Sequence, residues 1–128
     1  MNGVPRQTQK AMASFRQGEV IKVPFPYTDR STRQSRPALV VSAGGIEDAH
    51  ALLWVVMITS AENRGWMGDV AVSNLALAGL PVPSVIRTAK IATIEAADAT
   101  NLGRVSPALF RQVARHLAEV LGLVAQRL

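Results

Sequence analysis

The feature that most constrains the fold is a series of short apolar runs, each ended by glycine, proline or polar residues. Valine and isoleucine dominate these runs, and none approaches the roughly 20 apolar residues that cross a membrane as a helix. Short, regularly spaced strands predict a small β-barrel. We expect strands over Glu19–Phe25, Pro37–Ser42, Ala51–Thr59, Gly68–Ser73, Pro83–Thr88 and Lys90–Ile94.

The end of the chain changes to a helical period. Ser106 is a good N-cap, and Pro107 follows at the first helical position. The apolar residues that recur at helical spacing are Leu109, Phe110, Val113, Leu117, Val120 and Leu121. Gly122 is the expected stop, and the stretch Ser73–Leu80 has room for about one helical turn. The sequence therefore predicts a mainly β fold with a C-terminal helix.

The 128 residues fit one domain, which we place over residues 15–123. Residues 1–14 are interpreted as a flexible N-terminal leader or an expression remnant, and residues 124–128 as a C-terminal tail that frays. The leader has no apolar segment of the secretory kind. The absence of cysteine excludes a disulfide framework, a thiolate nucleophile and cysteine-based metal sites. A reducing, cytoplasmic location fits this composition.

The net charge of +5 favours a polyanionic partner. Arginines outnumber lysines eleven to three, and the arginine fork pairs with phosphate through two hydrogen bonds. The stretch Tyr27–Ser35 has no apolar residue after its tyrosine, so we expect an exposed, mobile loop there. Charge alone does not identify a nucleic-acid-binding protein.

The common enzyme motifs are absent. The chain has no P-loop, dinucleotide fingerprint, nucleophile elbow or His-Glu-x-x-His helix. His50 and His116 have no second histidine or carboxylate at ligand spacing, so no metal site is expected. His116 fits a helix surface or helix edge, and His50 a loop rim.

Four segments, spread over Gly18–Leu123, carry a resemblance to a known family. The first is Gly18-Glu-Val-Ile-Lys-Val-Pro-Phe-Pro-Tyr-Thr-Asp, and after the polar loop comes Arg36-Pro-Ala-Leu-Val-Val-Ser. Together they look like the opening two strands of the MazF/PemK family of toxin ribonucleases. The segments Ile58-Thr59-Ser60 and Ser84-Val85-Ile86-Arg87 also match the family's pattern, in order and at similar spacing.

The resemblance implies an SH3-like small β-barrel of the CcdB/PemK/MazF-like type with a C-terminal helix, usually as a homodimer. It implies a toxin of a type II toxin-antitoxin system that cleaves single-stranded mRNA without metal or other cofactor. In that chemistry the substrate's 2′-hydroxyl attacks the phosphate and leaves a 2′,3′-cyclic phosphate. It also implies a cognate antitoxin whose flexible acidic tail complements the positive charge of this chain.

Two residues are the expected catalytic pair. Arg36 follows the polar loop at a strand start, and we expect its guanidinium to stabilise the phosphorane and to donate a proton. Thr59 ends the third strand, where its hydroxyl would hydrogen-bond a non-bridging oxygen, with Ser60 assisting or substituting. An arginine before a proline is often only a surface charge, and a threonine at a strand end often reflects β-propensity alone.

The remaining site residues are expected to bind substrate. Asp29, Arg30 and Arg33 lie in the polar loop, and the two arginines suit backbone phosphates. Arg87 matches an arginine that some PemK-like members use in catalysis, but those members carry an acidic residue where this chain has Ala89. That departure leaves phosphate binding as the open role for Arg87.

The sequence offers three candidates for the general base and does not rank them. They are Asp29, Glu19 and Glu62. Trp66 stands in a polar turn, where it would stack on a base or pack against the barrel or an antitoxin. Three other functions stay open. They are a CcdB-like toxin that poisons a topoisomerase by protein contact, a non-catalytic SH3-like module that binds nucleic acid or peptide, and a family member inactivated by the change to Ala89.

Overall fold

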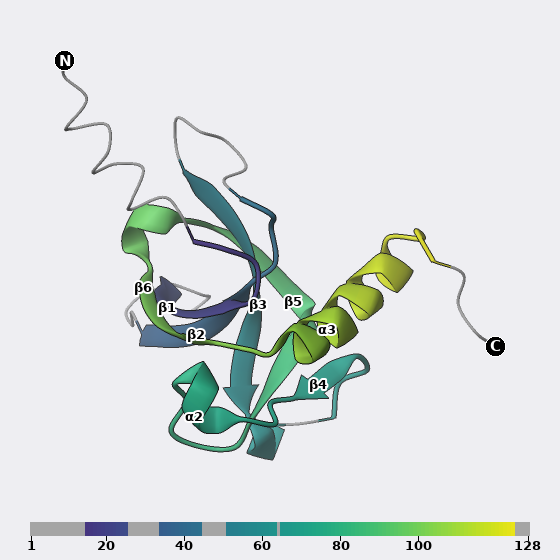
Figure 1. Cartoon of the computed structure of the whole chain (residues 1–128), viewed down its shortest axis with the longest axis horizontal. Coiled ribbons are helices and arrows are strands. Elements are labelled where there is room, and N and C mark those ends of the chain that lie inside the picture. The colour runs from purple at the N-terminus through teal and green to yellow at the C-terminus, as the bar shows by residue number, and fades with distance from the viewer. Residues whose placement is uncertain (1–14, 26–33, 45–50, 64, 125–128) are drawn as a thin grey trace.

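The protein is a curled antiparallel sheet with a C-terminal helix, seen here in a computed structural model that describes residues 15–25, 34–44, 51–63 and 65–124 (Figure 1). Six strands form one sheet in the order β4-β5-β3-β2-β1-β6. Their bounds are β1 Glu19–Phe25, β2 Gln34–Val40, β3 Leu52–Ser60, β4 Asp69–Ala71, β5 Ser84–Glu95 and β6 Thr100–Arg104. The predicted mainly β class with a C-terminal helix is confirmed. The strands curl as in a barrel, but the ladders of the described residues leave β4 and β6 as edges.

The described residues also form four helical elements, three short ones and one of 14 residues. They are η1 Ala61–Asn63, α2 Leu75–Ala78, η2 Ala96–Asp98 and α3 Pro107–Val120. At α3 the Ser106 side chain accepts the Leu109 amide at 3.1 Å, which confirms the predicted cap. None of the helices among the described residues is both long enough and apolar enough to span a bilayer.

The sheet buries apolar side chains on both faces. One cluster packs the sheet against α3 through Leu109 and Val113, with Val56 and Ile86 beneath them. A second cluster lies on the other face and includes Ile21, Val23, Ala38, Val40, Val55 and Met57. Because neighbouring residues of a strand face opposite sides, continuous apolar runs such as that of β3 are what a sheet covered on both faces requires.

Two glycines let α2 lie directly against β6. At Gly79, the left-handed C-cap of α2, an added Cβ would stand 2.0 Å from the carbonyl oxygen of Leu102. At Gly103 an added Cβ would stand 2.3 Å from the carbonyl oxygen of Leu77. Any side chain at either position would force the two elements apart.

Three strand predictions need correction. The expected strands Pro83–Thr88 and Lys90–Ile94 are one strand, β5, because the ladder with β3 continues across Ala89 through a register shift. The strand β6 was not predicted, because its sequence Thr-Asn-Leu-Gly-Arg lacks an apolar alternation and is held by pairing with β1. The second strand begins at Gln34 inside the expected loop, since Gln34 and Ser35 pair with Phe25 and Pro24.

Candidate functional site

The sheet register brings the expected catalytic residues to one face. Ala38 pairs with Met57, and Met57 with Arg87, so these side chains form a row across β2, β3 and β5. Continued by two residues in the antiparallel sense, the same register sets Arg36 opposite Thr59. The two residues are 23 apart in sequence and become neighbours through strand pairing.

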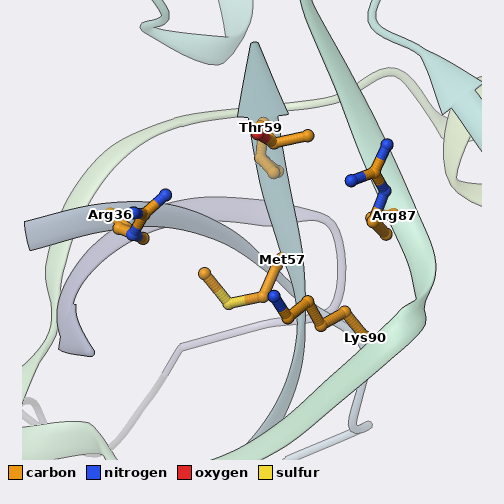
Figure 2. A pocket seen from close by; sticks show the side chains of 6 residues that line it. Arg36, Met57, Thr59, Arg87 and Lys90 are labelled. Atoms are coloured by element: carbon orange, nitrogen blue, oxygen red, sulfur yellow. The ribbon is translucent and has the colours of Figure 1, made fainter. Parts of the chain in front are cut away.

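A pocket of about 160 Å³ opens at this point. Its lining residues are Arg36, Met57, Ile58, Thr59, Arg87 and Lys90. Figure 2 shows Arg36 on β2, Met57 and Thr59 on β3, and Arg87 and Lys90 on β5, arranged around the same space. The pocket lies where the apolar cluster of this face, represented by Met57, gives way to polar and charged side chains. The Arg36 guanidinium, the Lys90 ammonium and the Thr59 hydroxyl make it suited to a phosphate.

Arg36 is partly buried and incompletely paired. Its Nη2 donates to the side-chain oxygen of Gln34 at 3.2 Å. Its Nε is buried without a hydrogen-bond partner among the described residues. A buried N–H without an acceptor is costly and gains most from an added anionic oxygen. The structure places Arg36 as the third residue of β2, so it is held by the ladder to Val23 and does not begin the strand.

Thr59 is oriented by a neighbouring side chain. The Asn63 amide donates to its hydroxyl oxygen at 3.1 Å, and an accepting hydroxyl still has its own hydrogen to donate. Ser60 makes a local structural contact instead. Its side-chain oxygen accepts a hydrogen bond from the Glu62 amide at 3.2 Å, where the chain turns into η1. Ser60 is absent from the described lining of the pocket.

Arg87 is a buried anchor. It donates from Nε and Nη2 to the two carboxylate oxygens of Asp69 at 3.1 and 2.9 Å, and Nη2 also donates to the Asn63 carbonyl. The Trp66 ring lies over its guanidinium at 4.3 Å. The hydrogen bond with Asp69 raises the pKa of Arg87 and, above all other causes, holds the pKa of Asp69 below its usual value.

Sequence reasoning missed Asp69 and Lys90. Asp69 pairs with Arg87 across β4 and β5, and only the strand register reveals the pair. Lys90 is three residues from Arg87, a spacing that places side chains on opposite faces of a regular strand. The register shift opposite Val56 and Met57 brings both to one pocket. The signal available in the sequence was the presence of two cationic residues, Arg87 and Lys90, in one strand.

The other predicted residues have different outcomes. Asp29, Arg30, Arg33 and His50 lie outside the described residues, as do residues 1–14 and 125–128. Glu19 and Glu62, two candidates for the general base, are absent from the described lining of the pocket. His116 lies at the helix surface, 3.9 Å from Glu119. Within the described ranges, no three His, Asp or Glu side chains gather as metal ligands.

The curled sheet and its C-terminal helix agree with the fold predicted from the sequence. The family model for the PemK-like, MazF-like toxin of type II toxin-antitoxin systems matches residues 16–121. The chain belongs to this family of toxins. No curated protein matches the sequence.

Solved structures share the fold. A mycobacterial endoribonuclease in complex with its cognate antitoxin has a TM-score of 0.68 at 23% identity, covering 88% of this chain and all of that chain (100%). A MazF of Deinococcus radiodurans gives 0.67 at 20% identity, over 85% and 97% of the two chains. The Mycobacterium tuberculosis toxin MazF-mt6 gives 0.65 at 20% identity, over 84% and 99%.

Proposed function

We propose that the chain is a metal-independent endoribonuclease that cuts single-stranded mRNA in the cytoplasm. The observation that carries this proposal is the meeting of Arg36 and Thr59 in one pocket, with Lys90 on a third strand. Family membership and the endoribonuclease among the structures of the same fold support it.

Arg36 and Thr59 have separate roles in the proposed reaction. The scissile phosphate enters the pocket, and the unpartnered Nε of Arg36 binds one of its oxygens. The Thr59 hydroxyl, held by Asn63, donates to a second oxygen. Attack by the 2′-hydroxyl on phosphorus builds negative charge on those oxygens, which is the moment at which preorganised donors are worth most. The P–O5′ bond then breaks, and Arg36 supplies a proton to the departing oxygen.

Removal of the 2′-hydroxyl proton needs a base, and the described lining of the pocket contains no carboxylate. Of the three candidates, Glu19 and Glu62 lie outside that lining. The base stays unassigned among Asp29, Glu19 and Glu62, and Asp29, Arg30 and Arg33 are proposed to bind substrate, the two arginines at backbone phosphates. Asp29→Asn tests Asp29 in the role of base, because loss of a catalytic carboxylate removes the rise of kcat/KM with pH that its deprotonation produces.

An antitoxin is the proposed protein partner. The mycobacterial endoribonuclease of the same fold was solved with its cognate antitoxin. Here Arg36, Arg87 and Lys90 line the pocket, and the whole chain carries a charge of +5, so an acidic flexible tail would be attracted to the site. Such a tail should inhibit cleavage competitively, and its inhibition should weaken with added salt.

A homodimer is proposed through the opposite side of the sheet. An apolar groove of about 620 Å³ runs between β3, β5 and the end of α3. Its lining includes the exposed side chains of Trp54, Ile91, Val120 and Leu121. A continuous exposed apolar surface of this kind is typical of a protein interface, and a second copy of the chain is the occupant that the family resemblance implies.

The test is incubation of the purified protein with mixed-sequence single-stranded RNA in excess EDTA, with the cut ends mapped. Discrete cuts that leave 2′,3′-cyclic phosphates support the proposal. Intact RNA would contradict it. A topoisomerase inhibition assay on the same preparation then distinguishes the protein-poisoning toxin from an inactive binding module. Cuts that disappear in EDTA would contradict metal independence alone.

A further inference from the structure

Trp66 lies in the turn before β4 and is fixed at its backbone. Its amide donates to the Asp69 carboxylate at 3.3 Å, and its carbonyl accepts the Asp69 amide at 3.2 Å. Gly65 and Gly68 flank it with φ angles of +126° and +87°, which other residues rarely adopt. The turn between η1 and β4 therefore holds this indole in a defined place.

The indole is half open to solvent and lies over two cations. The Arg87 guanidinium is 4.3 Å from the ring centroid and the Lys90 ammonium 5.9 Å, yet 48% of the residue is exposed. Single exposed apolar residues are common and need no explanation. Trp66 differs because both cations beneath it also line the pocket that holds Arg36 and Thr59.

The hydrogen-bonding capacity of Arg87 is largely used within the protein. Asp69 and the Asn63 carbonyl occupy its edge, and the Trp66 ring covers a face. An arginine held in this way is poorly placed to form hydrogen bonds with a phosphate. Its contacts instead fix the tryptophan, so we interpret Arg87 and Asp69 as positioning residues.

A second hollow continues the same face of the sheet beyond Arg87. It measures about 520 Å³ and includes Gly65, Asp69, Ala71 and Val85 in its lining. Val85 pairs with both Ala71 and Thr59, so this hollow and the catalytic pocket lie along one row of strands. A nucleotide chain that crosses from β2 to β4 would pass from Arg36 over Arg87 and the neighbouring indole.

We propose that Trp66 is a stacking platform for the nucleobase next to the scissile phosphate, on the β4 side of the pocket. This inference rests on the proposed ribonuclease function and adds a residue that positions the substrate. Every base has a π-face, so the platform sets affinity and placement of the RNA and leaves base choice to other contacts. Its loss should weaken RNA binding roughly 10- to 100-fold.

The first test measures RNA binding in the slow-cleaving Arg36→Ala background. A single-stranded oligonucleotide should quench tryptophan emission, and Trp66→Phe should remove that quenching while keeping most of the affinity, because phenylalanine still stacks. Trp66→Leu should lose both the quenching and most of the affinity for RNA. Met67→Ala is the matched control, since Met67 is the next residue in the turn and is 93% exposed.

The second test measures cleavage with Arg36 restored. Trp66→Leu should raise KM and leave kcat within a few-fold, and Asp69→Asn should shift KM in the same direction. If wild-type protein cleaves and Trp66→Leu binds and cleaves equally well, the platform is overturned and the ribonuclease stands. If no RNA is cleaved, the ribonuclease fails, and quenching that depends on Trp66 then supports stacking of a nucleobase on the indole but overturns its place beside a scissile phosphate. Quenching by an acidic antitoxin peptide but not by RNA also overturns it.

Discussion

Arg87 and Asp69 form a two-pronged ion pair that joins β5 to the edge strand β4. The donor-acceptor distances are 3.1 and 2.9 Å, and the two side chains are only 8% and 10% exposed. β4 has three residues, so its ladder alone provides few hydrogen bonds. The pair therefore holds the turn that carries Trp66 against the rest of the sheet.

Removal of the Asp69 charge should destabilise the protein. Asp69→Asn leaves the buried guanidinium of Arg87 without its counterion, and we expect the free energy of unfolding to fall by about 3 kcal/mol. Urea denaturation measures this change. Asp98→Asn is the control, because Asp98 is an exposed carboxylate on η2. Equal stability of the two variants would contradict the structural role of the pair.

The same pair should make the protein sensitive to acid. The pKa of Asp69 is lowered from its ordinary value of 3.8, so the folded state binds this proton less readily than the unfolded state. The stabilisation is fully present above pH 3.8 and is lost as the pH falls through the folded pKa. Wild-type stability should thus decline below about pH 4 more steeply than that of Asp69→Asn. Parallel slopes would contradict the assignment.

Much of the fold can be predicted from the sequence, and each wrong prediction has a physical cause. The apolar runs of β1 and β3 are buried on both faces, so composition alone locates them. β6 escapes prediction because it is a mostly polar strand that exists through pairing with β1. The division of β5 at Ala89 was wrong because the ladder with β3 continues there through a register shift, from the Met57–Arg87 pair to the Val56–Ile91 pair. The local periodicity of a sequence does not show which distant segments pair.

The hydroxyl of Thr59 should matter to turnover more than to folding. Thr59→Val keeps the shape and β-branching but removes the donor, so we expect kcat to fall about 100- to 1,000-fold. Thr59→Ser should keep most of the activity. Single-turnover cleavage measures the effect, and thermal unfolding provides the check on structure. Full activity in the valine variant would exclude Thr59 from the chemistry.

The groove beside α3 should be the dimer contact. Val120 is 78% exposed, so Val120→Lys adds a charge at the end of the helix without disturbing the core. We expect this variant to shift sedimentation from dimer to monomer at the same protein concentration. Gln112→Lys adds the same charge at an exposed position of α3 outside the groove and should remain dimeric. A monomeric wild-type protein would contradict the proposed dimer.

The site was only partly predictable. Arg36 and Thr59 were expected to act together because of the family resemblance, and the sheet register brings them to one pocket. The partner of Arg87 could not be predicted, since Asp69 is 18 residues away and the register between β4 and β5 is set by tertiary packing. For the same reason, Arg87 looked like a free phosphate ligand in the sequence, whereas the structure gives it internal partners.

The most direct measurement is the rate of RNA cleavage in EDTA by wild-type protein, Arg36→Ala and Arg104→Ala. Arg104 is an exposed arginine on β6, so its variant has the same net charge as Arg36→Ala and tests charge alone. We predict that wild-type protein and Arg104→Ala cleave at similar rates, and that Arg36→Ala loses at least 100-fold in kcat, roughly the effect of one lost transition-state donor, while it still binds RNA. Equal rates for the two alanine variants, or no cleavage by wild-type protein, would contradict the proposed catalytic role of Arg36.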